Sequence, residues 1–214
     1  MDLYFSPLAC SLATRIALYE ANASANFIQV DTQSKQIVDN KADDRDFFAV
    51  NALGQVPVLR EDDGWTLTEN SAVLQWVADR FPQAQLAPPA GTRERARLQQ
   101  WLGFIGTELH KAVFVPLLAT DTAEAVKHYA LSKVELRFGR LERHLSTHAY
   151  LLDAFSVADA YLVTVLNWAP YAGIDLARWP AVADYAKRMR ARPAVARAIA
   201  EELEIFKRER EQKK

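Results

Sequence analysis

The chain has 214 residues, of which 50% are hydrophobic, and a formal net charge of -1 at pH 7. This length suits one large domain or two small ones, with enough apolar residues for a sizeable core. The near-neutral charge argues against the basic surface that nucleic acid or an anionic membrane attracts, so we predict neither partner. The single cysteine, Cys10, excludes an internal disulfide framework and suits a reducing compartment, so we expect a cytoplasmic protein.

The first 80 residues alternate between extended and helical patterns. Residues 2–5 and 26–31 are predicted strands, and residues 11–20 between them carry apolar side chains at helical spacing. Residues 43–51 have acids near their start, which predicts a short helix. The pattern so far is strand, helix, strand, helix, which implies some parallel strand pairing.

A hairpin and a further helix complete this first region. Residues 55–60 and 65–69 are predicted strands, joined by a turn at Asp63-Gly64. Residues 70–81 predict an amphipathic helix, with Asn70 available as its cap. Because a hairpin adds antiparallel pairing, we predict a mixed four-stranded sheet in an α/β domain over residues 1–80.

The character of the chain changes after this domain. Residues 81–91 contain three prolines and a glycine, which predicts a linker. Residues 92–214 carry long helical patterns with few strand signals, so we predict an all-helical second domain. The helices expected there cover residues 92–114, 122–146, 155–171 and one or two segments within 178–206, with Thr92 and Thr122 as caps of the first two.

Cys10 lies between the first predicted strand and the first predicted helix. Unpaired backbone N–H groups and the positive end of the helix dipole lower a thiol pKa at such a position and favour the thiolate. Ligands also bind at strand ends in α/β layers. A cysteine that only packs in the core is the alternative, because buried cysteine is common. Both interpretations stay open at this level.

Two other stretches of the first domain carry weaker signals. Pro57 interrupts an apolar run, which indicates an edge strand, a bulge or a cis bond. Glu69 and Asn70 precede a helix whose free N–H groups can bind a ligand carboxylate, and Glu69 can pair with an ammonium. Ordinary capping by Asn70 explains the same pattern.

The second domain offers one candidate histidine. His110 and Lys111 fall in the middle of a predicted helix, where a lone histidine is most often structural or exposed. If that helix faces Cys10, His110 can instead hold or polarise a thiolate.

Two other patterns in this domain indicate folding rather than chemistry. Ser156 and Asp159 form a capping-box pattern ahead of an apolar run. His144 and His148 stand one turn apart without an evident third ligand, and one cysteine builds no zinc site, so we predict no metal.

Five stretches, in this order, resemble the glutathione S-transferases, and among them the bacterial beta class, along nearly the whole chain. They are "SPLACSLATRIAL", "NALGQVPVL", "LTENSAVLQWVAD", "WLGFIGTELHK" and "FSVADAYLVTVLNWAP". The resemblance implies a thioredoxin-like N-terminal domain, an α-helical C-terminal domain, a homodimer and glutathione as co-substrate in the cleft between domains. An apolar electrophile is the second substrate that it implies.

The resemblance also implies roles for individual residues. Cys10 would face the glutathione sulfur and form a mixed disulfide with it, and His110 would lie near that sulfur with Lys111 beside it. Val56 would pair its backbone with the tripeptide ahead of a cis Pro57, and Lys35 matches a family lysine at the glutathione site. The remaining matches are Glu69 and Asn70 at the γ-glutamyl end, Trp168 in the electrophile pocket, and Ser156 with Asp159 as the capping box.

Three departures from the family pattern bear on glutathione affinity. Position 70 is often serine or glycine in relatives and is Asn70 here. Leu53 stands where the class often has a lysine. Residues 34–46 are a few residues longer than in typical relatives and flank the position of Lys35.

The main prediction is therefore a glutathione transferase, acting by conjugation and by thiol–disulfide exchange through Cys10. A non-catalytic ligand-binding or regulatory protein of the same fold is one alternative, and a glutathione-dependent dehalogenase is another. The sequence names no electrophile.

Overall fold

The computed structural model of the chain describes residues 1–38 and 46–212. They divide into two compact units: an N-terminal unit of residues 1–86 with the C-terminal segment from Pro193, and a helical unit of residues 87–192. The N-terminal unit is α/β and the helical unit has no strand among its residues, so the predicted fold class is confirmed.

The sheet of the N-terminal unit has the strand order β3-β2-β1-β4-β5. Strand β1 pairs parallel with β2, and the other neighbouring strands pair antiparallel, so the predicted mixed sheet is confirmed. The short strand β3 is a fifth strand that the sequence did not reveal, because two residues are too few for a periodic pattern. The strands are β1 (Asp2–Phe5), β2 (Asn26–Asp31), β3 (Gln36–Ile37), β4 (Val58–Arg60) and β5 (Thr66–Leu67).

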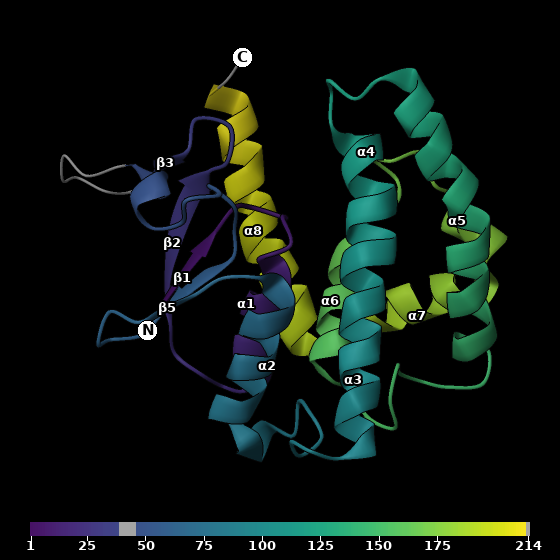
Figure 1. Ribbon diagram of the computed structural model, residues 1–214, viewed down its shortest axis with the longest axis horizontal. Coiled ribbons are helices and arrows are strands. Elements are labelled where there is room, and N and C mark those ends of the chain that lie inside the picture. The colour runs from purple at the N-terminus through teal and green to yellow at the C-terminus, as the bar shows by residue number, and fades with distance from the viewer. Residues whose placement is uncertain (39–45, 213–214) are drawn as a thin grey trace. The chain divides into compact units, whose positions relative to one another are not determined.

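Alternate residues of the strands serve the two faces of this sheet. Helices α1 (Leu12–Glu20), α2 (Asn70–Arg80) and α8 (Pro193–Gln212) lie on one side of it (Figure 1). Arg15 of α1 lies over the rings of Phe5 and Phe27 on that side. The buried Arg15 thereby adds cation–π contacts to the apolar packing of α1 on the sheet.

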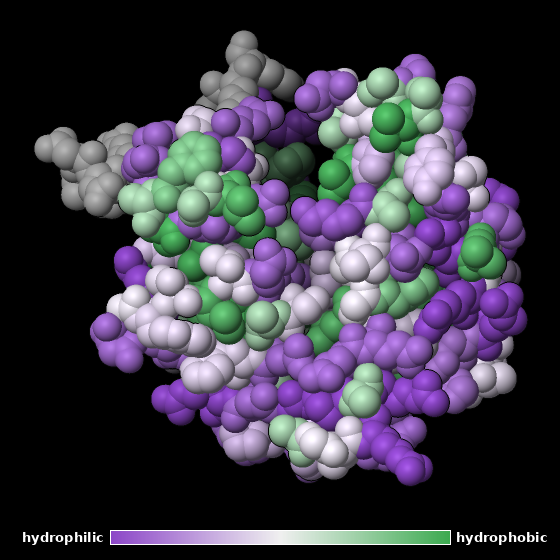
Figure 2. Space-filling view, viewed as in Figure 1, coloured by the Kyte–Doolittle hydropathy of each residue, from purple (hydrophilic) through white to green (hydrophobic). Residues whose placement is uncertain are grey.

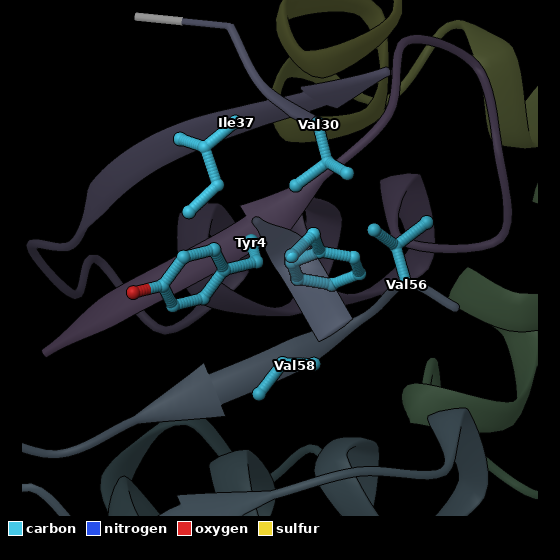
Figure 3. Packing of buried hydrophobic residues seen from close by; sticks show 6 residues of the cluster. Tyr4, Val30, Ile37, Val56 and Val58 are labelled. Atoms are coloured by element: carbon cyan, nitrogen blue, oxygen red, sulfur yellow. The ribbon is translucent and has the colours of Figure 1, made fainter. Parts of the chain in front are cut away.

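A second apolar cluster contains Tyr4, Val30, Ile37, Val56 and Val58 (Figure 3). Phe47 of the 3-10 helix η1 (Phe47–Ala49) completes it and is fully buried. The predicted helix over residues 43–51 is represented by η1 alone, since residues 39–45 lie outside the described residues. Because Val56 is 9% exposed within this cluster, the backbone just before β4 is fixed by packing.

The helical unit is built on one long helical segment. It runs from α3 (Arg93–Gly103) through the π-helix η3 (Phe104–Phe114) to α4 (Val115–Leu118). The Val115 N–H donates to the carbonyl of His110, five residues earlier, as π-winding requires. The other helices of the unit are α5 (Glu124–Leu145), α6 (Val157–Leu166), η4 (Leu176–Arg178) and α7 (Pro180–Arg190).

Several boundaries differ from the predicted ones. Helix α2 has Glu69 at its N-cap, so Asn70 lies inside the first turn and the prediction that it caps this helix is wrong. Helix α5 has Ala123 at its N-cap, not Thr122, whereas Thr92 does cap α3 by accepting from Arg95 N at 3.1 Å. Caps depend on backbone angles that sequence alone leaves open.

Two features of the structure bear on the predicted domain division. The predicted linker, residues 81–91, contains the 3-10 helix η2 (Pro82–Ala84), and the unit boundary follows Leu86. Helix α8 belongs to the N-terminal unit, although it was expected in the helical domain of residues 92–214. Its carboxylates Glu201 and Glu202 form ion pairs with Arg15 of α1, a pairing too distant in sequence for periodicity to indicate.

Candidate active site

Cys10 lies in the turn between β1 and α1, just before the helix N-cap Ser11. Its side chain is half-buried, and its thiol donates a hydrogen bond to the carbonyl of Val56, with 3.2 Å between Sγ and oxygen. The turn is closed by backbone hydrogen bonds from Leu12 to Ala9 and from Ala13 to Cys10. The structure thus brings together two predicted site residues that are 46 positions apart in sequence.

The Val56–Pro57 peptide bond is cis. The sequence allowed an edge strand, a bulge or a cis bond at Pro57, and the cis bond is the one that the family resemblance implied. The Val56 side chain is buried in the cluster of Figure 3, while its carbonyl faces the Cys10 thiol. The segment therefore holds one backbone acceptor beside the cysteine.

Helix α8 contacts the turn that contains Cys10 through Glu202. Leu8 has a positive φ of 60° and donates its N–H to Glu202 Oε2 at 2.7 Å. Arg15 Nε lies 2.9 Å from the other oxygen of Glu202. Burial raises the pKa of Glu202 to about 7, against the opposing effect of Arg15 and the Leu8 N–H. Sequence reasoning missed Glu202, since nothing in a charged C-terminal helix marks one glutamate as buried.

Lys35 is occupied within the N-terminal unit. Its Nζ donates to the carbonyl of Gly54 at 2.9 Å, and its backbone has a φ of 61°. Gly54 has a φ of 57°, and a Cβ there would lie 2.9 Å from both Lys35 Cδ and Phe48 Cε1, so this position requires glycine. Lys35 therefore binds the chain at Gly54, two residues before Val56.

The start of α2 joins the remaining predicted residues of this unit. Glu69 is exposed, with a φ of 66° and a ψ of 112° that are unusual for a residue with a side chain. Asn70 is buried, and its Oδ1 accepts from Thr14 Oγ1 of α1 at 3.4 Å. Strained backbone of this kind costs about 1–3 kcal/mol and concentrates at ligand sites.

His110 of η3 is surrounded by aromatic side chains of the helical unit. Its Nδ1 lies 2.7 Å from the Tyr161 hydroxyl, and its ring centroid lies 5.0 Å from that of Trp168. Burial, aided by the charge of Lys111, lowers the pKa of His110 to about 4. The imidazole is therefore neutral at physiological pH.

Lys111 and Trp168 differ in exposure. Lys111 is exposed on the helix surface, whereas Trp168 is half-buried and its ring also meets that of Phe114, with 5.8 Å between centroids. The structure thus brings together His110 and Trp168, two residues that the resemblance assigned to the active site, and adds Tyr161 to them. Sequence reasoning passed over Tyr161 because it read the apolar helix α6 only as core; a hydroxyl in such a helix was the available signal.

The described part of the chain contains no group of three or more His, Cys, Asp or Glu side chains that could hold a metal ion. His144 and His148 stack instead, with ring centroids 4.3 Å apart. None of the helices within residues 1–38 and 46–212 is long and apolar enough to cross a membrane.

Comparison with known proteins agrees with this geometry. The family model described as "Glutathione S-transferase, N-terminal domain" matches residues 9–80, and that described as "Glutathione S-transferase, C-terminal domain" matches residues 107–193. The glutathione S-transferase GstA of Escherichia coli O157:H7 is 37% identical over 203 residues, which cover 94% of this chain and 98% of the relative. The chain therefore belongs to the glutathione S-transferase family and is an enzyme of that family.

Solved structures extend the comparison. A sphingomonad glutathione S-transferase complexed with glutathione has a TM-score of 0.88 and 43% identity, over 94% of this chain and 98% of that one. The bacterial beta class glutathione S-transferase of Sphingomonas chungbukensis has a TM-score of 0.88 and 41% identity, over the same shares. The fold is thus the thioredoxin-like domain with an all-α domain that the resemblance implied, and its neighbours include the beta class.

Proposed function

We propose that this enzyme binds glutathione in a cleft between its two domains and directs the glutathione thiolate at apolar electrophiles. We propose further that it exchanges disulfides through Cys10. The observation that carries the second activity is the Cys10 thiol, half-buried and 3.2 Å from the Val56 carbonyl beside cis Pro57. A solved relative with bound glutathione supports glutathione as the co-substrate.

The N-terminal unit would hold the tripeptide. The backbone of Val56 would pair with it like an added strand, since main-chain hydrogen bonds give affinity in that mode. Glu69 would pair with the γ-glutamyl ammonium, and backbone N–H groups at the N-terminus of α2, where Asn70 lies, would donate to the γ-glutamyl carboxylate. Lys35 would have to leave the Gly54 carbonyl to reach a glutathione carboxylate.

The helical unit would supply a hydrogen-bond donor to the glutathione sulfur and side chains that line the electrophile pocket. A neutral His110 offers one N–H, which would stabilise the thiolate without adding a net charge. Trp168 would line the electrophile pocket beside it. Lys111, exposed on η3, would contribute positive potential near the bound anion.

Exchange at Cys10 proceeds by thiol–disulfide chemistry. Cys10 loses its thiol proton to solvent, and the thiolate attacks one sulfur of oxidised glutathione. A Cys10–glutathione disulfide forms as the glutathione disulfide breaks, and one glutathione leaves as its thiolate. A second thiol of the same class restores Cys10, because the chain contains no other cysteine to do so.

Intact mass spectrometry tests this proposal directly. The reduced protein is incubated with oxidised glutathione and weighed, for the wild type, Cys10→Ala and Cys10→Ser. We expect one glutathione adduct on the wild type and none on either variant. Retention on immobilised glutathione then measures binding separately from exchange.

Two assays rank the two activities. With a chloronitroaromatic substrate, Cys10→Ala is expected to lose far less activity than with a mixed disulfide. Equal losses would show that the thiol serves both reactions. No adduct together with no retention on immobilised glutathione would contradict both, and would favour a non-catalytic member of the family.

We also propose that the enzyme is a cytoplasmic homodimer. Large apolar side chains are exposed on both units, and Figure 2 shows such residues scattered among polar ones on the face in view. Leu53 is 66% exposed and Leu136 is 69% exposed. Sedimentation equilibrium should give twice the chain mass, and a monomer mass at micromolar concentration would contradict the dimer.

A further inference from the structure

The contact between His110 and Tyr161 joins two elements of the helical unit. His110 lies on η3 and Tyr161 on α6, and 2.7 Å separates Nδ1 from the hydroxyl oxygen. The two rings meet edge to face, with an interplanar angle of 87°. Tyr161 is only 2% exposed, so packing fixes where its hydroxyl lies.

The distance indicates which group donates. An N–H donor most often lies about 2.9–3.0 Å from an oxygen acceptor, and 2.7 Å is the short end of that range, whereas O–H donors form shorter bonds, most often about 2.7–2.8 Å to oxygen. A phenol is also a good donor, and an unprotonated imidazole nitrogen is a good acceptor. The 2.7 Å contact therefore favours the Tyr161 hydroxyl as donor and His110 Nδ1 as acceptor.

Neutrality makes this assignment consequential. Burial lowers the pKa of His110 to about 4, so the ring carries a single proton at physiological pH. A ring that accepts at Nδ1 must carry that proton on Nε2, since a neutral imidazole has one donor and one acceptor. The Trp168 ring, 5.0 Å away between centroids, limits rotation of the imidazole into another orientation.

We infer that Tyr161 is a positioning residue that fixes His110 in the Nε2–H tautomer, so that His110 presents a hydrogen-bond donor on the side of the ring away from α6. The value of that donor for catalysis rests on the proposed function, in which His110 stabilises the glutathione thiolate. The tautomer itself does not depend on that function.

Nuclear magnetic resonance measures the tautomer without any substrate. Long-range ¹H–¹⁵N correlation spectra of ¹⁵N-labelled wild type at pH 7 distinguish the two neutral tautomers, and His110→Gln identifies the His110 signals. We expect Nε2–H in the wild type and a mixture of both tautomers in Tyr161→Phe. An Nδ1–H wild type, or a Tyr161→Phe protein that keeps pure Nε2–H, would overturn the inference.

Tyr185→Phe is the matched control. It also removes a buried hydroxyl from the helical unit, but that hydroxyl donates to Asp159 at 2.9 Å. We expect Tyr185→Phe to lose stability and to retain the wild-type tautomer of His110. If Tyr161→Phe does not fold, the wild-type spectrum alone still decides which nitrogen carries the proton.

Steady-state kinetics separate this inference from the proposed function. In Tyr161→Phe, kcat for conjugation should fall about tenfold, with KM for glutathione within about twofold of wild type. A shifted tautomer with unchanged kcat would support the positioning role and contradict the catalytic role of His110. An unshifted tautomer with reduced kcat would instead contradict the positioning role.

Discussion

The two units stabilise their buried carboxylates in different ways. In the helical unit, Asp159 is fully buried and accepts from Leu151 N, Ser156 N, Ser156 Oγ and the Tyr185 hydroxyl, each at 2.9 Å. In the N-terminal unit, Glu202 is equally buried but has the Leu8 N–H and the charge of Arg15 as partners. Neutral hydrogen-bond donors thus surround Asp159, whereas Glu202 pairs with the buried Arg15.

The backbone differs in the same sense. Among the described residues, all five non-glycine residues with positive φ lie in the N-terminal unit, and they are Leu8, Asn22, Lys35, Glu69 and Gln85. Three of them, Leu8, Lys35 and Glu69, adjoin or belong to the candidate glutathione site. Such strain persists only where the surrounding structure holds the residue in place. We therefore infer that these residues lower the stability of the N-terminal unit and help to set the shape of its site.

Removing the carboxylate of Asp159 should have the largest effect on stability. Asp159→Ala leaves four buried donors without an acceptor, so we expect a loss of about 3–5 kcal/mol in urea unfolding. Asp159→Asn keeps one carbonyl oxygen and should lose about 2 kcal/mol. Equal losses in the two variants would show that packing, and not hydrogen bonding, is what Asp159 contributes.

The charge of Glu202 should make the N-terminal unit sensitive to pH. Its folded pKa of about 7 exceeds the unfolded value of 4.5, so the folded state holds a proton that the unfolded state releases in this range. Stability therefore falls as pH rises from 4.5 to 7, by up to about 3 kcal/mol from this group. Urea unfolding of wild type and Glu202→Gln at pH 5 and 7.5 measures the difference in slope.

In this comparison, the wild type should lose stability relative to Glu202→Gln as the pH rises. A constant difference between the two proteins would mean that Arg15 keeps Glu202 charged throughout the range. Disulfide exchange by Cys10 is a second readout for Glu202→Gln, because the Leu8 N–H that donates to Glu202 lies two residues before the cysteine.

A smaller loss is expected at the start of α6. Ser156 and Asp159 form the predicted capping box, and the Ser156 hydroxyl donates to Asp159 Oδ2 at 2.9 Å. Ser156→Ala should cost about 1–2 kcal/mol, as for other capping residues. Ser146→Ala is a suitable control, because Ser146 is exposed and follows the end of α5; a similar loss there would rule out a specific capping effect.

The smallest expected effect has the opposite sign. Glu69→Gly removes the side chain that makes a φ of 66° with a ψ of 112° unfavourable, so stability should rise by about 1 kcal/mol while glutathione affinity falls. Glu69→Gln keeps the strain and should leave stability unchanged. Gln85→Gly is the comparison at ordinary left-handed angles, a φ of 53° and a ψ of 35°, where glycine should gain less than at Glu69; an equal gain there would mean that positive φ in general, and not the unusual ψ of Glu69, explains the effect.

The candidate site was predictable where its signals are local or carried by the family resemblance. Cys10 at a helix start, the capping box of Ser156 and Asp159, and the hairpin around Gly64 all depend on residues close in sequence. The resemblance added His110 and Trp168, which the structure brings together in the helical unit. The prediction that Asn70 caps α2 was wrong, because the N-cap is Glu69, whose backbone angles no residue propensity favours.

By itself, the sequence determined the α/β-then-helical order of the chain, its mixed sheet and the residues of its candidate site. These follow from the periodicity of apolar residues and from capping and turn residues, which act over a few positions. Only the tertiary structure decided that Cys10 meets the Val56 carbonyl, that Tyr161 meets His110, and that α8 carries Glu202 beneath the Cys10 turn. Such contacts join residues far apart in the chain, and burial and packing select them once the elements have formed.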